Sequence, residues 1–275
     1  LGQRSPTRDG MSGGIDVWGT VTLACGMVAL LLGITQGPVW GWFSPPVLGL
    51  FAGAVVILAV FGALERRIAH PVIDIRLLTQ RSLLLTHLGA LALGVNQFLF
   101  YILLPKLAQL PNDLPAAAEA VVDYGFGASV TGAALIVLPG TLLVLPASWS
   151  ANRVERGFGK RAPLVLGLVL AGAAGILLAF GHAQVWQVVV FNLVCSAGHG
   201  FAMAALPSLV NEASEPTQSA SANGINTVAR VFGGAVGSQI ASAILGGVVI
   251  AGTGYPAESG FVIAFVVAAG VGLLG

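Results

Sequence analysis

Residues 162–181 read APLVLGLVLAGAAGILLAFG, and this stretch decides the fold class. Every side chain in it is apolar or absent, and it carries no charge. About 20 apolar residues, at about 1.5 Å of rise per residue, cross the roughly 30 Å hydrocarbon core of a bilayer as an α-helix. The stretch therefore predicts a transmembrane helix.

Four similar stretches precede it and three follow it. The expected spans are 17–37, 45–64, 83–105, 127–149, 162–181, 186–209, 220–250 and 259–275. Their apolar runs are continuous, whereas strands of a membrane barrel alternate over about 10 residues. Charged residues make up 8% of the chain, against about 25% in soluble domains, and the mean hydropathy is +0.90. We predict an all-α polytopic transmembrane helix bundle of about eight spans.

Lysine and arginine are distributed unevenly between the two sides of this bundle. Alternate gaps between spans hold nearly all of them: Arg4, Arg8, Arg66, Arg67, Arg76, Arg81, Arg153, Arg156, Lys160 and Arg161. The other gaps hold only Lys106. Basic loops remain in the cytoplasm, so we expect a multi-pass inner (plasma) membrane protein with both ends cytoplasmic. A formal net charge of +1 without basic blocks argues against a nucleic-acid partner.

The last apolar run begins near Phe261 and is still apolar at Gly275. We therefore expect the chain to be a fragment of a longer protein, and the alternative is a complete small protein with a short last helix. The expected divisions are a cytoplasmic segment at 1–16, two transmembrane helices with a cytoplasmic loop at 17–80, and a six-helix unit at 81–275 whose last helix is truncated.

Polar and small side chains form stripes on two of the spans. On 83–105 they recur at spacings of three and four: His87, Ala90, Gly94, Gln97 and Tyr101, with Asn96 on the flank. On 186–209 they are Asn192, Cys195, Ser196, His199 and Met203. A stripe of this kind faces a cavity or a partner helix rather than lipid. The candidates for a substrate cavity are His87, Asn96, Gln97, Tyr101, Asn192 and His199. The alternative is hydrogen bonding between helices, at about 0.6–2 kcal/mol per contact.

Charged groups are scarce inside the spans. No Asp or Glu lies clearly in mid-span, so the chain offers no obvious carboxylate to carry protons. A membrane histidine can relay protons, and for His87 and His199 the alternative is a structural donor. Arg230, near the start of 220–250, is expected to form a structural or gating ion pair with Glu212 or Glu215. His182 is expected in a solvated loop.

Small residues four apart predict close helix packing. One set is Gly167, Ala171 and Gly175, and the other is Gly233, Gly237 and Ala241. Pro139, Pro146 and Pro207 interrupt two spans, which suits helices that move against one another as well as static packing.

Several segments resemble a known family in their order and spacing. They are 16–19 (DVWG), 36–42 (QGPVWGW), 65–67 (ERR) with Pro71 and 74–77 (DIRL), 198–207 (GHGFAMAALP) and 221–237 (SANGINTVARVFGGAVG). Together they resemble the fourteen-helix drug:proton antiporters of the major facilitator superfamily, over nearly the whole chain. The resemblance implies two linker helices followed by the C-terminal half of a transporter. It also implies that the missing N-terminal half holds the main membrane carboxylate.

One basic segment resembles a motif of that superfamily. Residues 152–161 (NRVERGFGKR) are similar to the short loop D-R-x-G-R-[KR], whose basic residues latch a cytoplasmic gate. The candidate gate residues are Asn152, Arg153, Arg156, Gly157, Lys160 and Arg161. Asn152 stands where an acid is usual, and extra residues precede Gly157, which weakens the expected latch. Simple anchoring by positive charge is the alternative.

The sequence thus favours a fragment of a proton-coupled exporter of amphipathic drugs or small molecules that works by alternating access. A dedicated metabolite or antibiotic exporter of the same superfamily, with the fragment itself inactive, remains open. The expected partners are membrane lipid, a small-molecule substrate, protons and the N-terminal half. We expect no cofactor and no metal. Motifs of a membrane enzyme or of a channel filter do not occur.

Overall fold

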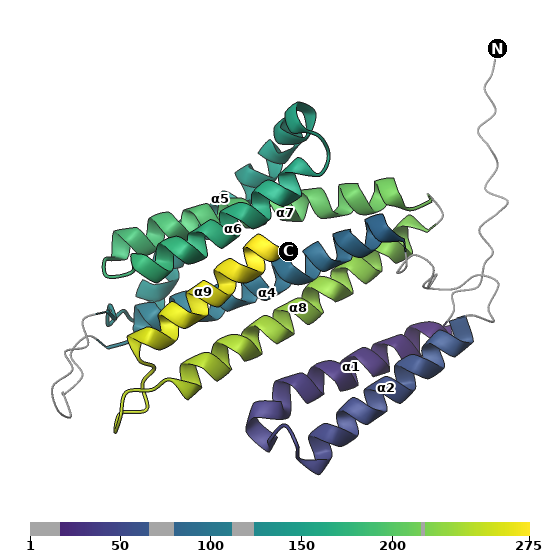
Figure 1. Cartoon of the computed structure of the whole chain (residues 1–275), viewed down its shortest axis with the longest axis horizontal. Coiled ribbons are helices and arrows are strands. Elements are labelled where there is room, and N and C mark those ends of the chain that lie inside the picture. Colours follow the sequence, from purple (N-terminus) through teal and green to yellow (C-terminus); the bar gives the residue numbers. More distant parts are fainter. Residues whose placement is uncertain (1–16, 66–79, 112–123, 216–217) are drawn as a thin grey trace. The chain divides into compact units, whose positions relative to one another are not determined.

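A computed structural model describes residues 17–65, 80–111, 124–215 and 218–275, and all regular structure in these ranges is helical (Figure 1). The helices fall into two compact units. In the first, α1 (Val17–Trp40) packs on α2 (Pro45–Glu65), and four residues join them. A connection this short produces an antiparallel helical hairpin.

The second unit contains six helices. They are α4 (Arg81–Gln109), α5 (Val130–Phe158), α6 (Ala162–Phe180), α7 (Val185–Ala213), α8 (Ser219–Gly247) and α9 (Glu258–Leu274). α4 contacts all the other five, and its pairing with α8 is the most extensive contact in the unit. The main apolar core forms where α4, α6, α7 and α9 meet, around residues such as Leu103, Leu178, Phe261 and Phe265.

Helix length and hydropathy agree with the predicted membrane protein. Among the described helices, α2, α4, α5, α6, α7 and α8 are long and apolar enough to cross a bilayer. The apolar part of α1 (Val21–Gly37) and the whole of α9 are shorter. The eight expected stretches therefore all form helices in the described residues, and six of them meet the requirement for a span.

Glycine sets the distance between helices at several crossings. A Cβ on Gly237 would overlap the carbonyl group of Val95, and one on Gly233 would overlap that of Leu91, so α8 and α4 are nearly in backbone contact. On α6, a Cβ on Gly167 would lie 2.5 Å from the Gly198 carbonyl oxygen of α7. The prediction of close packing at these small residues is confirmed.

Helix ends extend beyond the apolar spans. α5 was expected to end near 149 but continues to Phe158, and Gly159, with φ +92°, then ends it. α4 continues to Gln109, so Lys106 lies in its last turn rather than in a loop. As a result, the basic residues of α5 stand on helical turns. We call the end of the second unit formed by the starts of α4, α6 and α8 and the ends of α5 and α7 the basic end, because it carries Arg81, Arg153, Arg156, Lys160 and Arg161.

Candidate functional site

A hydrogen-bonded pair of polar side chains lies in the middle of the second unit. Asn96 on α4 donates from Nδ2 to the Ala268 carbonyl of α9 over 2.8 Å, which fixes the orientation of its amide. Its Oδ1 then faces His199 Nε2 on α7 at 2.8 Å. The imidazole must therefore carry its proton on Nε2 and donate to Asn96. Both side chains are buried, so these two predicted cavity residues join three helices.

A small cavity lies beside this pair, between α4, α5 and α7. Its volume is about 30 Å³, which is room for a water molecule but far below the roughly 300–1,000 Å³ of a drug-sized site. Its polar lining is Tyr101, Thr141, Asn192, Ser196 and His199. Three of the six residues predicted for a substrate cavity thus face one space.

The polar residues of this cavity are partly engaged with one another. Asn192 donates to the Val137 carbonyl of α5 at 3.1 Å, and Ser196 lies 3.5 Å from Asn192 Oδ1. Gln97 donates from Nε2 to the Tyr101 hydroxyl at 2.8 Å, while its Oε1 is buried without a partner. Tyr101 is 54% exposed, so this pair leads from the interior of α4 to its open face.

His87 lies apart from this group. It is 14 residues before Tyr101 on α4, which corresponds to about 21 Å of helix. Asn226 of α8 donates to His87 Nδ1 at 3.3 Å, and Nε2 is buried without a partner. Asn226 was not among the predicted residues, although its amide within the 220–250 span is a signal that could have identified it.

The predicted gate residues gather at the basic end. Asn152, Arg153, Arg156 and Gly157 lie on the last turns of α5, and Lys160 and Arg161 lie in the turn to α6. Lys160 Nζ forms an ion pair with Glu212 Oε1 of α7 at 3.0 Å. Glu212 thus pairs with Lys160, and its expected pairing with Arg230 is absent from the ion pairs of the described ranges. The Arg230 backbone instead lies against Gly94, where a Cβ would overlap its carbonyl.

His182 differs from its prediction as a solvated loop residue. It is only 6% exposed, because it lies just beyond the end of α6 against Phe265 of α9. Its Nδ1 is 2.8 Å from the Leu178 carbonyl, and its Nε2 is 3.2 Å from Glu258 Oε1 at the start of α9. Tyr124, also buried, donates to the nearby Pro256 carbonyl at 2.8 Å. These contacts hold the end opposite the basic one together.

Sequence comparison finds similarity to known resistance and export proteins. No protein-family model matches the sequence. The chain is 27% identical to a tetracycline resistance determinant of Streptomyces rimosus, over 84% of this chain and 64% of that protein. It is 26% identical to the multidrug resistance protein Stp of Mycobacterium tuberculosis, over 86% of this chain and 41% of that protein. It is 27% identical to the cephamycin export protein CmcT of Amycolatopsis lactamdurans, over 89% of this chain and 48% of that protein.

The chain is thus similar to drug-resistance transporters of the major facilitator superfamily. It spans about half the length of these relatives. Together with the six described helices that are long and apolar enough to cross a bilayer, this similarity supports a multi-pass membrane protein. The cavity described above is bounded by three helices of one unit alone.

Proposed function

We propose that this chain supplies the C-terminal half, with two linker helices, of a proton-coupled exporter of amphipathic small molecules. The observation that carries the proposal is the small cavity between α4, α5 and α7. Its polar lining, with Tyr101, Asn192 and His199, lies within helices that are long and apolar enough to cross a bilayer. Polar side chains inside a membrane bundle face a pathway or one another. Here some do both.

Alternating access explains why the cavity is small. In this mechanism two helix bundles rock against each other around a site between them, so one half contributes a wall rather than a complete pocket. The wall proposed here consists of Gln97, Tyr101, Thr141, Asn192 and Ser196. Asn96 and His199 hold that wall on α9 through their hydrogen bonds. The cargo crosses unchanged, without a chemical step.

The proposed membrane position follows from charge. The basic end lies on the cytoplasmic side of an inner membrane, because loops rich in lysine and arginine are retained in the cytoplasm. Arg153, Arg156, Lys160 and Arg161 then form part of a cytoplasmic gate, with the Lys160–Glu212 ion pair joining α7 to the α5–α6 turn. The proton-binding carboxylate is assigned to the other half of the transporter, in line with the implied family mechanism.

A dedicated antibiotic exporter is a second candidate, because one relative is named a cephamycin export protein. Everted vesicles that contain the transporter with this chain distinguish the two. Gradient-dependent uptake of ethidium, abolished by an ionophore and absent from vesicles without the protein, supports multidrug export. Uptake of cephamycin or tetracycline alone supports the dedicated exporter. Inserted protein with no uptake of any of the three contradicts both.

Variants then test the wall itself. Gln97→Ala and Tyr101→Ala are expected to change the ratio of ethidium to tetracycline uptake by roughly fivefold or more, since one lost polar contact is worth about 1 kcal/mol. The matched control is Ser82→Ala, an exposed residue in the first turn of the same helix, far from the proposed wall. Equal loss of both cargoes in the Gln97 and Tyr101 variants would indicate a structural role instead.

A further inference from the structure

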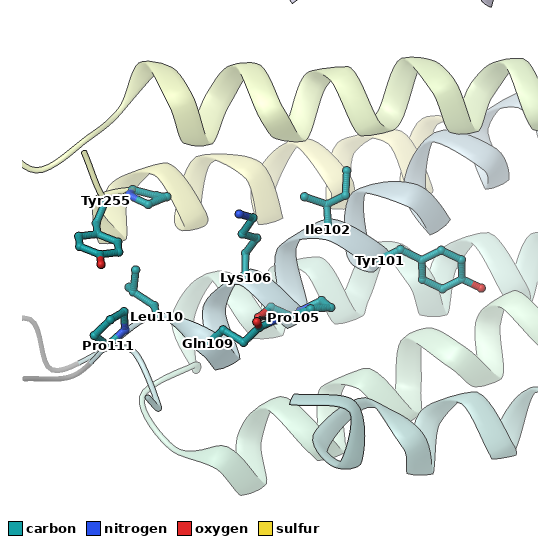
Figure 2. A pocket seen from close by; sticks show the side chains of 9 residues that line it. Tyr101, Ile102, Pro105, Lys106, Gln109, Leu110, Pro111 and Tyr255 are labelled. Atoms are coloured by element: carbon teal, nitrogen blue, oxygen red, sulfur yellow. Dashed lines mark hydrogen bonds between the residues drawn. The ribbon is translucent and has the colours of Figure 1, made fainter. Parts of the chain in front are cut away.

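A second, larger pocket lies at the opposite end of the bundle from the basic end. Its volume is about 370 Å³, within the range of sites for small organic ligands. It is lined by the last two turns of α4 and by the turn that precedes α9, through Ile102, Pro105, Lys106, Gln109, Pro111 and Tyr255 (Figure 2). Tyr101 lines both this pocket and the small cavity.

A single cation stands in this pocket. In the view of Figure 2 the Lys106 side chain stands between Tyr255 on one side and Ile102 on the other. Lys106 is exposed, and no acid lies within ion-pair distance of it in the described ranges. Glu258, at the start of α9, lies 3.2 Å from His182. Among the described residues of the lining, Lys106 is the only group with a formal charge, and this charge would attract an anion.

The rest of the lining is suited to an apolar body. Pro105, Pro111 and Ile102 present aliphatic surface, and Tyr255 presents an aromatic ring. An anion on a compact apolar frame matches this combination better than a cation, which Lys106 would repel.

We propose that this pocket binds an amphipathic organic anion, with its carboxylate or similar group on Lys106 and its apolar body against Ile102, Pro105 and Tyr255. The ligand is either a soluble aryl carboxylate or the headgroup region of an anionic lipid, which share this chemistry. The site goes beyond the proposed function, because binding is expected of this chain without transport. Absence of export would therefore not contradict anion binding in this pocket, and absence of anion binding would not contradict the proposed export.

The test is equilibrium dialysis with the chain in phosphatidylcholine nanodiscs, against empty nanodiscs as the blank. The probes are radiolabelled 2-naphthoate and its neutral counterpart 2-naphthamide. We expect the naphthoate to bind more tightly than the amide. Lys106→Met should weaken naphthoate binding roughly tenfold, since a charge-assisted hydrogen bond is lost, and should leave amide binding unchanged. Lys106→Arg should retain most of the affinity.

The matched control is Arg81→Met, which removes an exposed cation from the other end of the same helix. It should bind naphthoate as the unmodified chain does. Adding phosphatidylglycerol to the nanodiscs distinguishes the two ligand sources. If the lipid weakens naphthoate binding, and does so only when Lys106 is present, the ligand is the anionic lipid. If naphthoate binding is unchanged, the ligand is the soluble anion. Equal binding of the two probes, or naphthoate affinity unaltered by Lys106→Met, would overturn the proposal.

Discussion

His199 Nε2 lies 2.8 Å from Asn96 Oδ1, and this contact links α7 to α4 while Asn96 links α4 to α9. One amide therefore satisfies two buried groups on two other helices. The two residues were predicted on separate polar stripes, and the structure joins the stripes at this point. Because each partner is buried, the bond is a structural connection of the proposed wall rather than an open ligand site.

Replacing Asn96 with leucine, which is similar in size, removes the acceptor of the buried His199 N–H and the side-chain donor to the Ala268 carbonyl. We expect a loss of about 1–3 kcal/mol in the free energy of unfolding, because the His199 N–H then keeps only its weak contact with the Cys195 sulfur. This exceeds the roughly 0.6 kcal/mol average for a membrane hydrogen bond. Unfolding in mixed micelles of dodecylmaltoside and dodecyl sulfate measures it. Asn152→Ala, on an exposed turn of α5, serves as the control. A loss no larger than in this control would contradict the connecting role.

Glycines on α8 provide a paired experiment on helix packing. A Cβ on Gly237 would overlap the Val95 carbonyl group, whereas nothing lies within 4 Å of one on Gly224 of the same helix. Gly237→Ala should therefore destabilise the unit by roughly 1–3 kcal/mol through overpacking. Gly224→Ala should be neutral or stabilising by up to about 1 kcal/mol, because alanine favours helix. The same micelle unfolding measures both, and equal effects would show that the α4–α8 contact tolerates a wider separation.

Hydropathy predicted where the helices cross the membrane, but not where they end. The apolar run of α5 stops near 149, yet Ala151, Arg153 and Glu155 after it favour a helix, which continues through Gly157 and ends before Gly159. The spans mark the hydrocarbon, whereas the helix continues into water. The same limit led to the placement of Lys106 in a loop. His182 shows a second limit, since its polarity indicated exposure and only the packing of α6 on α9 buries it.

Spacing predicted three residues that line one cavity, Tyr101, Asn192 and His199, but it did not predict their partners. Periodicity places Asn192 and His199 on one face of α7, and it says nothing of which helix that face meets. Glu212 illustrates the point: it was a predicted partner of Arg230, whereas the fold of the α5–α6 turn brings Lys160, which is distant in sequence, to it. Partner choice depends on contacts between distant segments.

The Lys160–Glu212 ion pair is expected to affect transport more than stability. Both side chains are about half exposed, so breaking the pair with Glu212→Gln should change the free energy of unfolding by less than about 1 kcal/mol. If the pair latches a gate, Lys160→Met and Glu212→Gln should each change ethidium turnover in the same direction, by roughly two- to fivefold. The swap Lys160→Glu with Glu212→Lys should restore it. If the two substitutions act independently and the swap does not restore turnover, the pair is not a gate latch. The basic residues then serve only to anchor this end by their charge.

Tyr124 gives the bundle a dependence on alkaline pH. Burial raises the pKa of its phenol above the ordinary 10.0, and the Glu258 carboxylate raises the pKa further. The unfolded chain therefore loses this proton at a lower pH than the folded chain, so the unfolded state binds fewer protons between the two values. Stability contributed by Tyr124 is complete below about pH 10 and is lost as the pH rises through the folded pKa.

The free energy of unfolding, measured from pH 8 to pH 11.5, should show this fall. Tyr124→Phe should remove this part of the pH dependence, although it also deletes the hydrogen bond to the Pro256 carbonyl and so lowers stability at every pH. A profile that keeps the full alkaline slope in Tyr124→Phe would assign the fall to other groups.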